Sequence, residues 1–157
     1  FTNRVRSSGR TQIRTPDDGY GRELYRRKIA SMITSMAGSS EYFTGGVVAY
    51  CNEVKHNVLG VSEADLNTFG AVSQPVVEQM ARGTMRVLGC DCAVATSGIA
   101  GPGGGTPSKP VGTVWIAAAY EERILSECYH FGENPRMENI RLSAEAALRM
   151  LLGLIRE

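Results

Sequence analysis

Apolar residues recur along this chain in two patterns, one typical of helices and the other typical of buried strands. Helical spacing and end signals predict helices at residues 22–37, 52–60, from residue 62 onward, 73–89 and from 135 or 137 to 155. Short apolar runs predict strands at residues 45–50, 92–96, 114–119 and 124–131. Helices and strands therefore alternate along most of the chain.

This alternation predicts an α/β fold, in which helices cover a mostly parallel sheet. The last two strands are joined by a short turn, so we expect a hairpin that makes the sheet mixed. The 157 residues fit one domain, which we place at residues 22–157. Residues 1–21 lack apolar periodicity and are predicted to form an irregular, disordered tail. A basic arm that touches nucleic acid is the alternative for this tail.

Charge and cysteine content narrow the function classes. The chain carries 17 basic and 16 acidic residues, so its near-neutral charge argues against nucleic-acid binding and gives no indication of membrane binding. Its four cysteines form no C-x-x-C pair, and the two histidines are not spaced to complete a metal site with them. We therefore expect reduced thiols in a cytoplasmic protein without a metal.

A glycine- and proline-rich loop at residues 98–110 is the most informative segment. It follows a buried strand, and ligands of open α/β sheets bind at the carboxyl ends of strands. Its glycines allow backbone N–H groups to approach an anion, and Lys109 would add a positive charge. The segment is neither a P-loop nor a dinucleotide-binding fingerprint. Phosphate binding and a purely structural Ω-loop both remain open.

Further candidate residues lie where strands end. Lys55 would serve as a general base if burial lowered its pKa, although a helical lysine is more often a solvated charge. Tyr50 fits a core aromatic equally well. Ser97 could bind a ligand or cap the loop. Arg136 and Arg141 suit phosphate recognition or a plain surface role.

Several linked motifs resemble one protein family. Residues 45–55 match the pattern G-G-x-x-x-Y-[SC]-N-x-x-K, and the remaining blocks follow in the expected order at residues 59–61, 70–73, 96–102, 104–107, 109–114 and 131–136, with Arg141. This set, which spans about four-fifths of the chain, is similar to the CinA C-terminal domain, whose members are nicotinamide-nucleotide amidases.

The resemblance implies a three-layer α/β/α domain, a homodimer and a small-molecule nucleotide substrate. It implies hydrolysis of the carboxamide of nicotinamide mononucleotide by a serine nucleophile and a lysine base, without cofactor or metal. By motif position Lys55 would be the base, Tyr50 and Asn52 would orient it or the substrate, and Ser97 would supply a hydroxyl. The substrate-binding residues would be Gly45, Gly46, Gly98, Gly101, Gly104, Gly105 and Arg136.

One family motif is missing. The nucleophile belongs to A-E-S-C-T-G-G at the start of the first helix, but residues 21–28 read G-R-E-L-Y-R-R-K and place Glu23 at the nucleophile position. A permitted set of codons for residues 19–29, shifted by one base, encodes A-T-A-E-S-C-T-G-G. One added A then restores the frame of Lys28. We hypothesise that the segment up to about Arg27 is an out-of-frame reading, which sequencing the gene would decide.

Three functions follow as alternatives. The first is an amidase of pyridine nucleotide salvage, impaired here because its nucleophile is missing. The second is a nucleotide-binding module without chemistry. The third is a structural domain associated with competence, which salt-dependent DNA binding would support.

Overall fold

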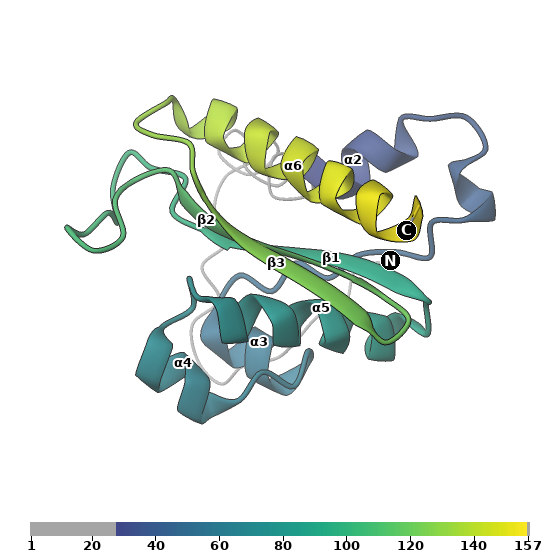
Figure 1. Cartoon of the computed structure of the whole chain (residues 1–157), viewed down its shortest axis with the longest axis horizontal. Helices are drawn as coiled ribbons and strands as arrows, with labels where there is room; N and C mark the ends of the chain where they lie inside the picture. The colour runs from purple at the N-terminus through teal and green to yellow at the C-terminus, as the bar shows by residue number, and fades with distance from the viewer. Residues whose placement is uncertain (1–27, 157) are drawn as a thin grey trace, which may run out of the picture.

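The computed structural model describes residues 28–156, which form three layers with a sheet between two sets of helices (Figure 1). The predicted α/β fold is therefore confirmed. The elements are α2 (Lys28–Thr34), η1 (Ser39–Glu41), α3 (Asn52–Asn57), α4 (Glu63–Phe69), α5 (Gln74–Leu88), β1 (Cys92–Gly98), β2 (Thr113–Tyr120), β3 (Arg123–His130) and α6 (Arg136–Arg156). Across residues 28–156, no helix combines the length and apolar character needed to cross a bilayer.

The sheet has the order β1-β2-β3, and both pairs are antiparallel. Cys92 faces Tyr120 in the first pair, and Thr113 faces His130 in the second. The predicted hairpin is confirmed, but these described strands do not form the mostly parallel sheet that we expected. The reason is the connection between β1 and β2, which is a loop without a helix. It reverses the direction of the chain, so that β2 runs back alongside β1. Parallel neighbours need a longer crossover, usually through a helix.

Side chains on β2 alternate between two apolar cores. Ala117 and Ala119 face α5 in a core that also contains Val61, Val76 and Val77. On the other face, Val114, Ile116 and Ala118 pack against α6 through Ala147, Met150 and Leu154. The period of two along a strand sends successive residues to opposite faces. Burial on both faces explains the continuous apolar run that the sequence shows at this strand.

Residues 45–50 do not form the predicted strand. Their exposure alternates as a strand's would, and Val47 and Ala49 pack on the core beneath β1. However, among the described residues no backbone hydrogen bond joins this segment to β1. In Figure 1 it is the extended coil that leads into α3. The apolar pattern correctly indicated which side chains are buried. It did not indicate whether the backbone of this segment forms hydrogen bonds with a neighbouring strand.

The predicted helix at residues 22–37 is shorter at its C-terminal end, because α2 stops at Thr34. The hydroxyls of Thr34 and Ser35 donate to the carbonyls of Ala30 and Met32, at 2.8 and 2.7 Å, and so compete for the helix's last acceptors. Residues 22–27 and the tail at 1–21 lie outside the described residues. The predicted domain boundary therefore stays a prediction.

Helix ends follow the predicted signals at most positions. Ser62 caps α4 by accepting a hydrogen bond from the Asp65 N–H, and Gly89 ends α5 in the left-handed conformation. α3 begins at Asn52, as the sequence predicts, with Cys51 as its N-cap, but it ends at Asn57, before the predicted end at residue 60.

Gly83 is required where α5 crosses the turn after α3. A Cβ atom at this position would lie 2.0 Å from the Leu59 carbonyl oxygen, which belongs to the backbone and cannot rotate away. We expect Gly83→Ala to lower the free energy of unfolding by about 3 kcal/mol, as overpacking does. Gly153 in α6 has open space around it, so Gly153→Ala should stabilise by about 0.5–1 kcal/mol. Urea denaturation of both variants checks the pair, and equal effects would contradict the explanation.

Candidate active site

Lys55 is the charged side chain that the fold buries most completely among the described residues, with 6% of its surface exposed. It lies in α3, and its ammonium group points back to the extended segment before the helix. There Nζ donates to the carbonyl oxygens of Ala49 at 3.0 Å and Tyr50 at 3.5 Å. Buried lysines are rare unless they are paired, so the sequence-based alternative of a solvated charge does not describe this residue.

Burial lowers the pKa of Lys55 below its usual value of 10.5, because the low-dielectric surroundings disfavour the charged amine. The nearby Cys51 thiol acts weakly in the opposite direction. Both carbonyl partners accept hydrogen bonds from Nζ, so the nitrogen is held in one place. A positioned amine with a lowered pKa is what a general base requires near neutral pH.

Tyr50 and Asn52 lie on either side of the α3 N-cap. Tyr50 contributes its carbonyl to Lys55, while its own side chain is on the surface with the residue 64% exposed. Asn52 is also exposed, at the first position of α3. Tyr50, Asn52 and Lys55 therefore form one group around the start of α3, in which lysine is the buried member.

The glycine-rich loop connects β1 to β2 and is held at its base. Gly112 donates its N–H to the Ile99 carbonyl at 2.8 Å and accepts from the Phe131 N–H at 2.9 Å. A Cβ on Gly112 would lie 2.3 Å from the Gly132 oxygen, so glycine permits this close approach. Residues 102–108, which include Gly104 and Gly105, are exposed. The loop therefore has a fixed base and an accessible tip.

Lys109 of the loop and Ser97 at the end of β1 are bonded to the end of α4 and to the connection that follows it. Lys109 donates through Nζ to the Phe69 carbonyl at 2.8 Å. Ser97, which is buried at the end of β1, donates through Oγ to the Ala71 carbonyl at 2.7 Å. The Lys109 ammonium and the Ser97 hydroxyl, which we expected to contact a ligand, thus donate hydrogen bonds to backbone carbonyls in this structure. A ligand would have to share them or displace these bonds.

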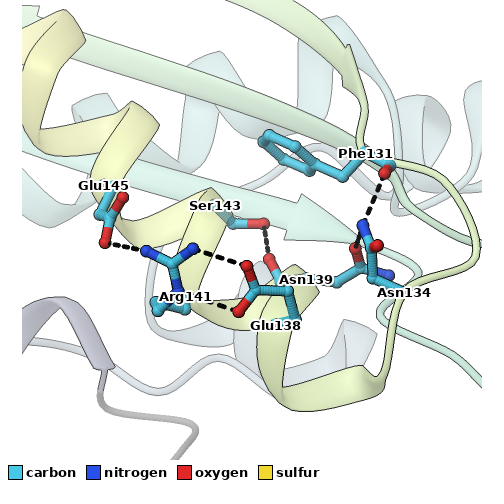
Figure 2. Close-up of polar contacts among 7 residues, drawn as sticks. All are labelled: Phe131, Asn134, Glu138, Asn139, Arg141, Ser143 and Glu145. Carbon is cyan, nitrogen blue, oxygen red and sulfur yellow. Dashed lines mark hydrogen bonds and ion pairs between the residues drawn. The ribbon is translucent and has the colours of Figure 1, made fainter.

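The two arginines at the start of α6 have different partners. Arg136 donates through Nη1 to the Gly101 carbonyl at 2.8 Å, which places it at the base of the loop. Arg141 makes a two-point ion pair with Glu138 at 2.6 and 2.9 Å, and it also pairs with Glu145 (Figure 2). These carboxylates raise the pKa of Arg141, and the Arg141 hydrogen bonds lower the pKa of Glu138. Of these two arginines, it is therefore Arg136 that a hydrogen bond joins to the loop.

Two of the predicted substrate-binding glycines lie elsewhere. Gly45 approaches the side chain of Leu88, at the end of α5 that precedes β1, and Gly46 has open space around it. The glycine-rich loop leaves β1 at its other end, at Gly98. Lys55 donates to carbonyl oxygens of the segment before α3, whereas Ser97, Lys109 and Arg136 donate to the carbonyl oxygens of Ala71, Phe69 and Gly101. Gly45 and Gly46 therefore lie apart from the glycine-rich loop.

Sequence reasoning missed Asn139. Its side chain is completely buried in α6 and contacts both the glycine-rich loop and the loop before α6. A signal for it was present, because Asn139 lies on the same helical face as Ser143, Ala147, Met150 and Leu154, all of which are buried. A polar residue on a buried face needs hydrogen-bond partners, and here those partners are loop carbonyls.

Sequence comparison identifies relatives for most of the chain. The family model of the CinA C-terminal domain matches residues 28–155. The chain is 47% identical over 125 residues to the nicotinamide-nucleotide amidohydrolase PncC of Enterobacter agglomerans, covering 77% of this chain and 76% of that protein. It is also 49% identical over 123 residues to a CinA-like protein of Rippkaea orientalis, where it covers 76% of this chain but only 29% of the longer relative.

Solved structures agree with these sequence matches. The competence/damage inducible protein of Agrobacterium tumefaciens superposes with a TM-score of 0.81 at 39% identity, covering 83% of this chain and 80% of that one. A competence-damaged protein superfamily member from Escherichia coli gives a TM-score of 0.78 at 29% identity, covering 83% and 76%. Fold and sequence therefore point to the same group of proteins.

Proposed function

Because the chain belongs to the CinA C-terminal domain family, we propose that its fold is that of an amidase acting on nicotinamide mononucleotide. The products would be nicotinic acid mononucleotide and ammonia, a reaction of cytoplasmic pyridine nucleotide salvage. The observation that carries the proposal is the buried Lys55, whose pKa is lowered and whose Nζ is held by two carbonyls. The name of the similar Enterobacter agglomerans protein supports the choice of substrate.

In the proposed reaction, a hydroxyl attacks the carboxamide carbon while Lys55 accepts its proton. The C–N bond then breaks, and ammonia leaves with a proton returned by Lys55. Water hydrolyses the resulting ester and regenerates the hydroxyl. Tyr50 and Asn52 would position Lys55 or the substrate, and Ser97 would contribute a hydroxyl. Arg136 and the loop glycines Gly98, Gly101, Gly104 and Gly105 would bind the phosphate.

We further propose that turnover by this chain is impaired. The family match begins at Lys28, and the residues before it do not contain the nucleophile motif. This observation favours a second candidate, a nucleotide-binding module that retains the pocket and lacks the chemistry.

Binding of nicotinamide mononucleotide tests the common part of both candidates. At about 100 times its Kd, the nucleotide would stabilise the fold by about 2.7 kcal/mol and raise Tm by roughly 5 to 10 °C. Nicotinamide riboside, which lacks the phosphate, should give a smaller shift. Differential scanning fluorimetry provides the measurement, and an unchanged Tm at saturating nucleotide would refute binding. Ammonia release in the same samples separates the enzyme from the binding module.

A further inference from the structure

Asn139 has no exposed surface, which sets it apart from the other buried polar side chains described in this fold. All three hydrogen bonds of its side-chain amide reach residues in loops. Nδ2 donates to the Ala100 carbonyl at 3.2 Å and to the Gly132 carbonyl at 3.1 Å. Oδ1 accepts a hydrogen bond from Asn134 Nδ2 at 3.2 Å. A buried amide with this many partners is fully committed to one arrangement.

The partners of Asn139 belong to two segments far apart in sequence. Ala100 is at the base of the glycine-rich loop, next to the Gly101 carbonyl that Arg136 binds. Gly132 and Asn134 belong to the connection between β3 and α6, where Asn134 also donates to the Phe131 carbonyl at 2.7 Å (Figure 2). One side chain therefore joins the loop to the connection and to the helix at once.

We propose that Asn139 is a positioning residue that fixes the base of the glycine-rich loop. The exposed residues 102–108 are then presented to a ligand phosphate in one geometry rather than many. The identity of this ligand rests on the proposed function, whereas the attachment of the loop does not. Asn139 itself touches only protein groups, so its effect on binding acts through the loop.

Only an amide fits this arrangement. Two carbonyl oxygens require a donor, and the Asn134 amide donor requires an acceptor, so one side chain must supply both. Asn139→Asp keeps the shape but places a carboxylate oxygen against two carbonyl oxygens. Asn139→Ala removes all three side-chain hydrogen bonds and leaves the Ala100 carbonyl without this partner. Both changes should release the loop, and alanine does so without adding a charge.

Ser143→Ala is the matched control. Ser143 is also buried on α6, one turn further along, and its hydroxyl donates to the Asn139 backbone carbonyl at 2.6 Å (Figure 2). Removing that hydroxyl costs one buried hydrogen bond in the same helix without removing a bond to either loop. A role that is merely structural would lower stability without a selective effect on hydrogen exchange in the loop. A positioning role would accelerate hydrogen exchange in the loop in Asn139→Ala but not in Ser143→Ala.

Hydrogen exchange of the full chain without ligand gives the first measurement. The amides of Ile99 and Gly112 are bonded at the loop base, to Thr113 and Ile99 carbonyls. In Asn139→Ala we expect exchange over residues 99–112 to accelerate roughly tenfold, the effect of losing one or two buried hydrogen bonds. In Ser143→Ala it should stay within about twofold, and exchange in β2 should change little in either variant. Equal acceleration in both variants, or none in either, overturns the proposal.

Calorimetric titration with nicotinamide mononucleotide gives the second measurement. Kd should increase roughly tenfold in Asn139→Ala and stay unchanged in Ser143→Ala. If the unaltered chain binds no nucleotide while the loop still accelerates selectively, the proposed function fails and the positioning role stands. If Asn139→Ala does not fold, Asn134→Ala replaces it, because it removes the donor that orients the Asn139 amide. Unchanged loop exchange in Asn134→Ala would then overturn the proposal.

Discussion

Replacing residues 22–27 by E-S-C-T-G-G is expected to raise ammonia release from nicotinamide mononucleotide by roughly a thousandfold or more. The replacement returns a serine to the position of Glu23, ahead of the helix α2. A glutamate carboxylate cannot take the serine's part simply, because its acyl product would be an anhydride. In the proposed mechanism, Lys55 and the glycine-rich loop supply the base and the phosphate site, and the nucleophile is the component that the replacement adds. A coupled ammonia assay under saturating nucleotide provides the measurement.

The matched control for this replacement is E-A-C-T-G-G, which restores the same backbone segment without the hydroxyl. It should bind the nucleotide as the repaired protein does and release ammonia at the background rate. If the original chain is as active as the repaired one, another residue is the nucleophile and the assigned chemistry is wrong. If neither is active, the amidase proposal itself fails.

Lys55→Met in the repaired protein is expected to lower kcat/KM by roughly a thousandfold, within the range that a general base contributes. Methionine fills much of the same volume but cannot accept a proton. The loss of bonds to the Ala49 and Tyr50 carbonyls is offset because a thioether is easier to bury than an amine, so we expect the free energy of unfolding to change by about 1 kcal/mol or less at neutral pH. Arg149→Met, at a surface position of α6, is the control for a lost positive charge. A comparable loss in both variants would contradict a specific role for Lys55.

The lowered pKa of Lys55 also predicts how activity and stability depend on pH. Activity should rise with pH and level off at the lowered pKa, since only the neutral amine accepts a proton. Between that pKa and 10.5 the unfolded chain binds more protons at this residue than the folded chain. The contribution of Lys55 to the free energy of unfolding therefore increases as pH rises through this window. Urea titrations at several pH values should show this increase, and Lys55→Met should lack it.

Much of the fold was predictable because burial leaves a periodic mark on sequence. The apolar runs at β1, β2 and β3 and the helical stripes of α5 and α6 predicted elements whose bounds differ by only one or two residues. Strand direction was less accessible, because a parallel and an antiparallel neighbour bury the same side chains. Residues 45–50 illustrate the same point. Their alternation of buried and exposed side chains comes from the packing of Val47 and Ala49 against the core, and not from pairing with a strand.

The candidate site was predictable in part, for a similar reason. Motif spacing singled out Lys55 and the glycine-rich loop, and the burial of Lys55 then excluded the alternative of a solvated surface charge. Residue type alone did not distinguish Arg136 from Arg141, and only the motif resemblance singled out Arg136, because the role of an arginine depends on which acceptors lie nearby. Arg136 donates to the Gly101 carbonyl, whereas Arg141 forms ion pairs with the carboxylates of Glu138 and Glu145.

The contacts at the loop base have a consequence for the order of folding. Asn139 reaches across 39 residues to Ala100, and Arg136 reaches across 35 residues to Gly101. Contacts over such separations form only after the intervening chain has been closed into a loop at an entropic cost. We expect the β2–β3 hairpin to form early and the glycine-rich loop to become ordered only when α6 docks. The glycine-rich loop would then be among the last parts to fold and among the first to open.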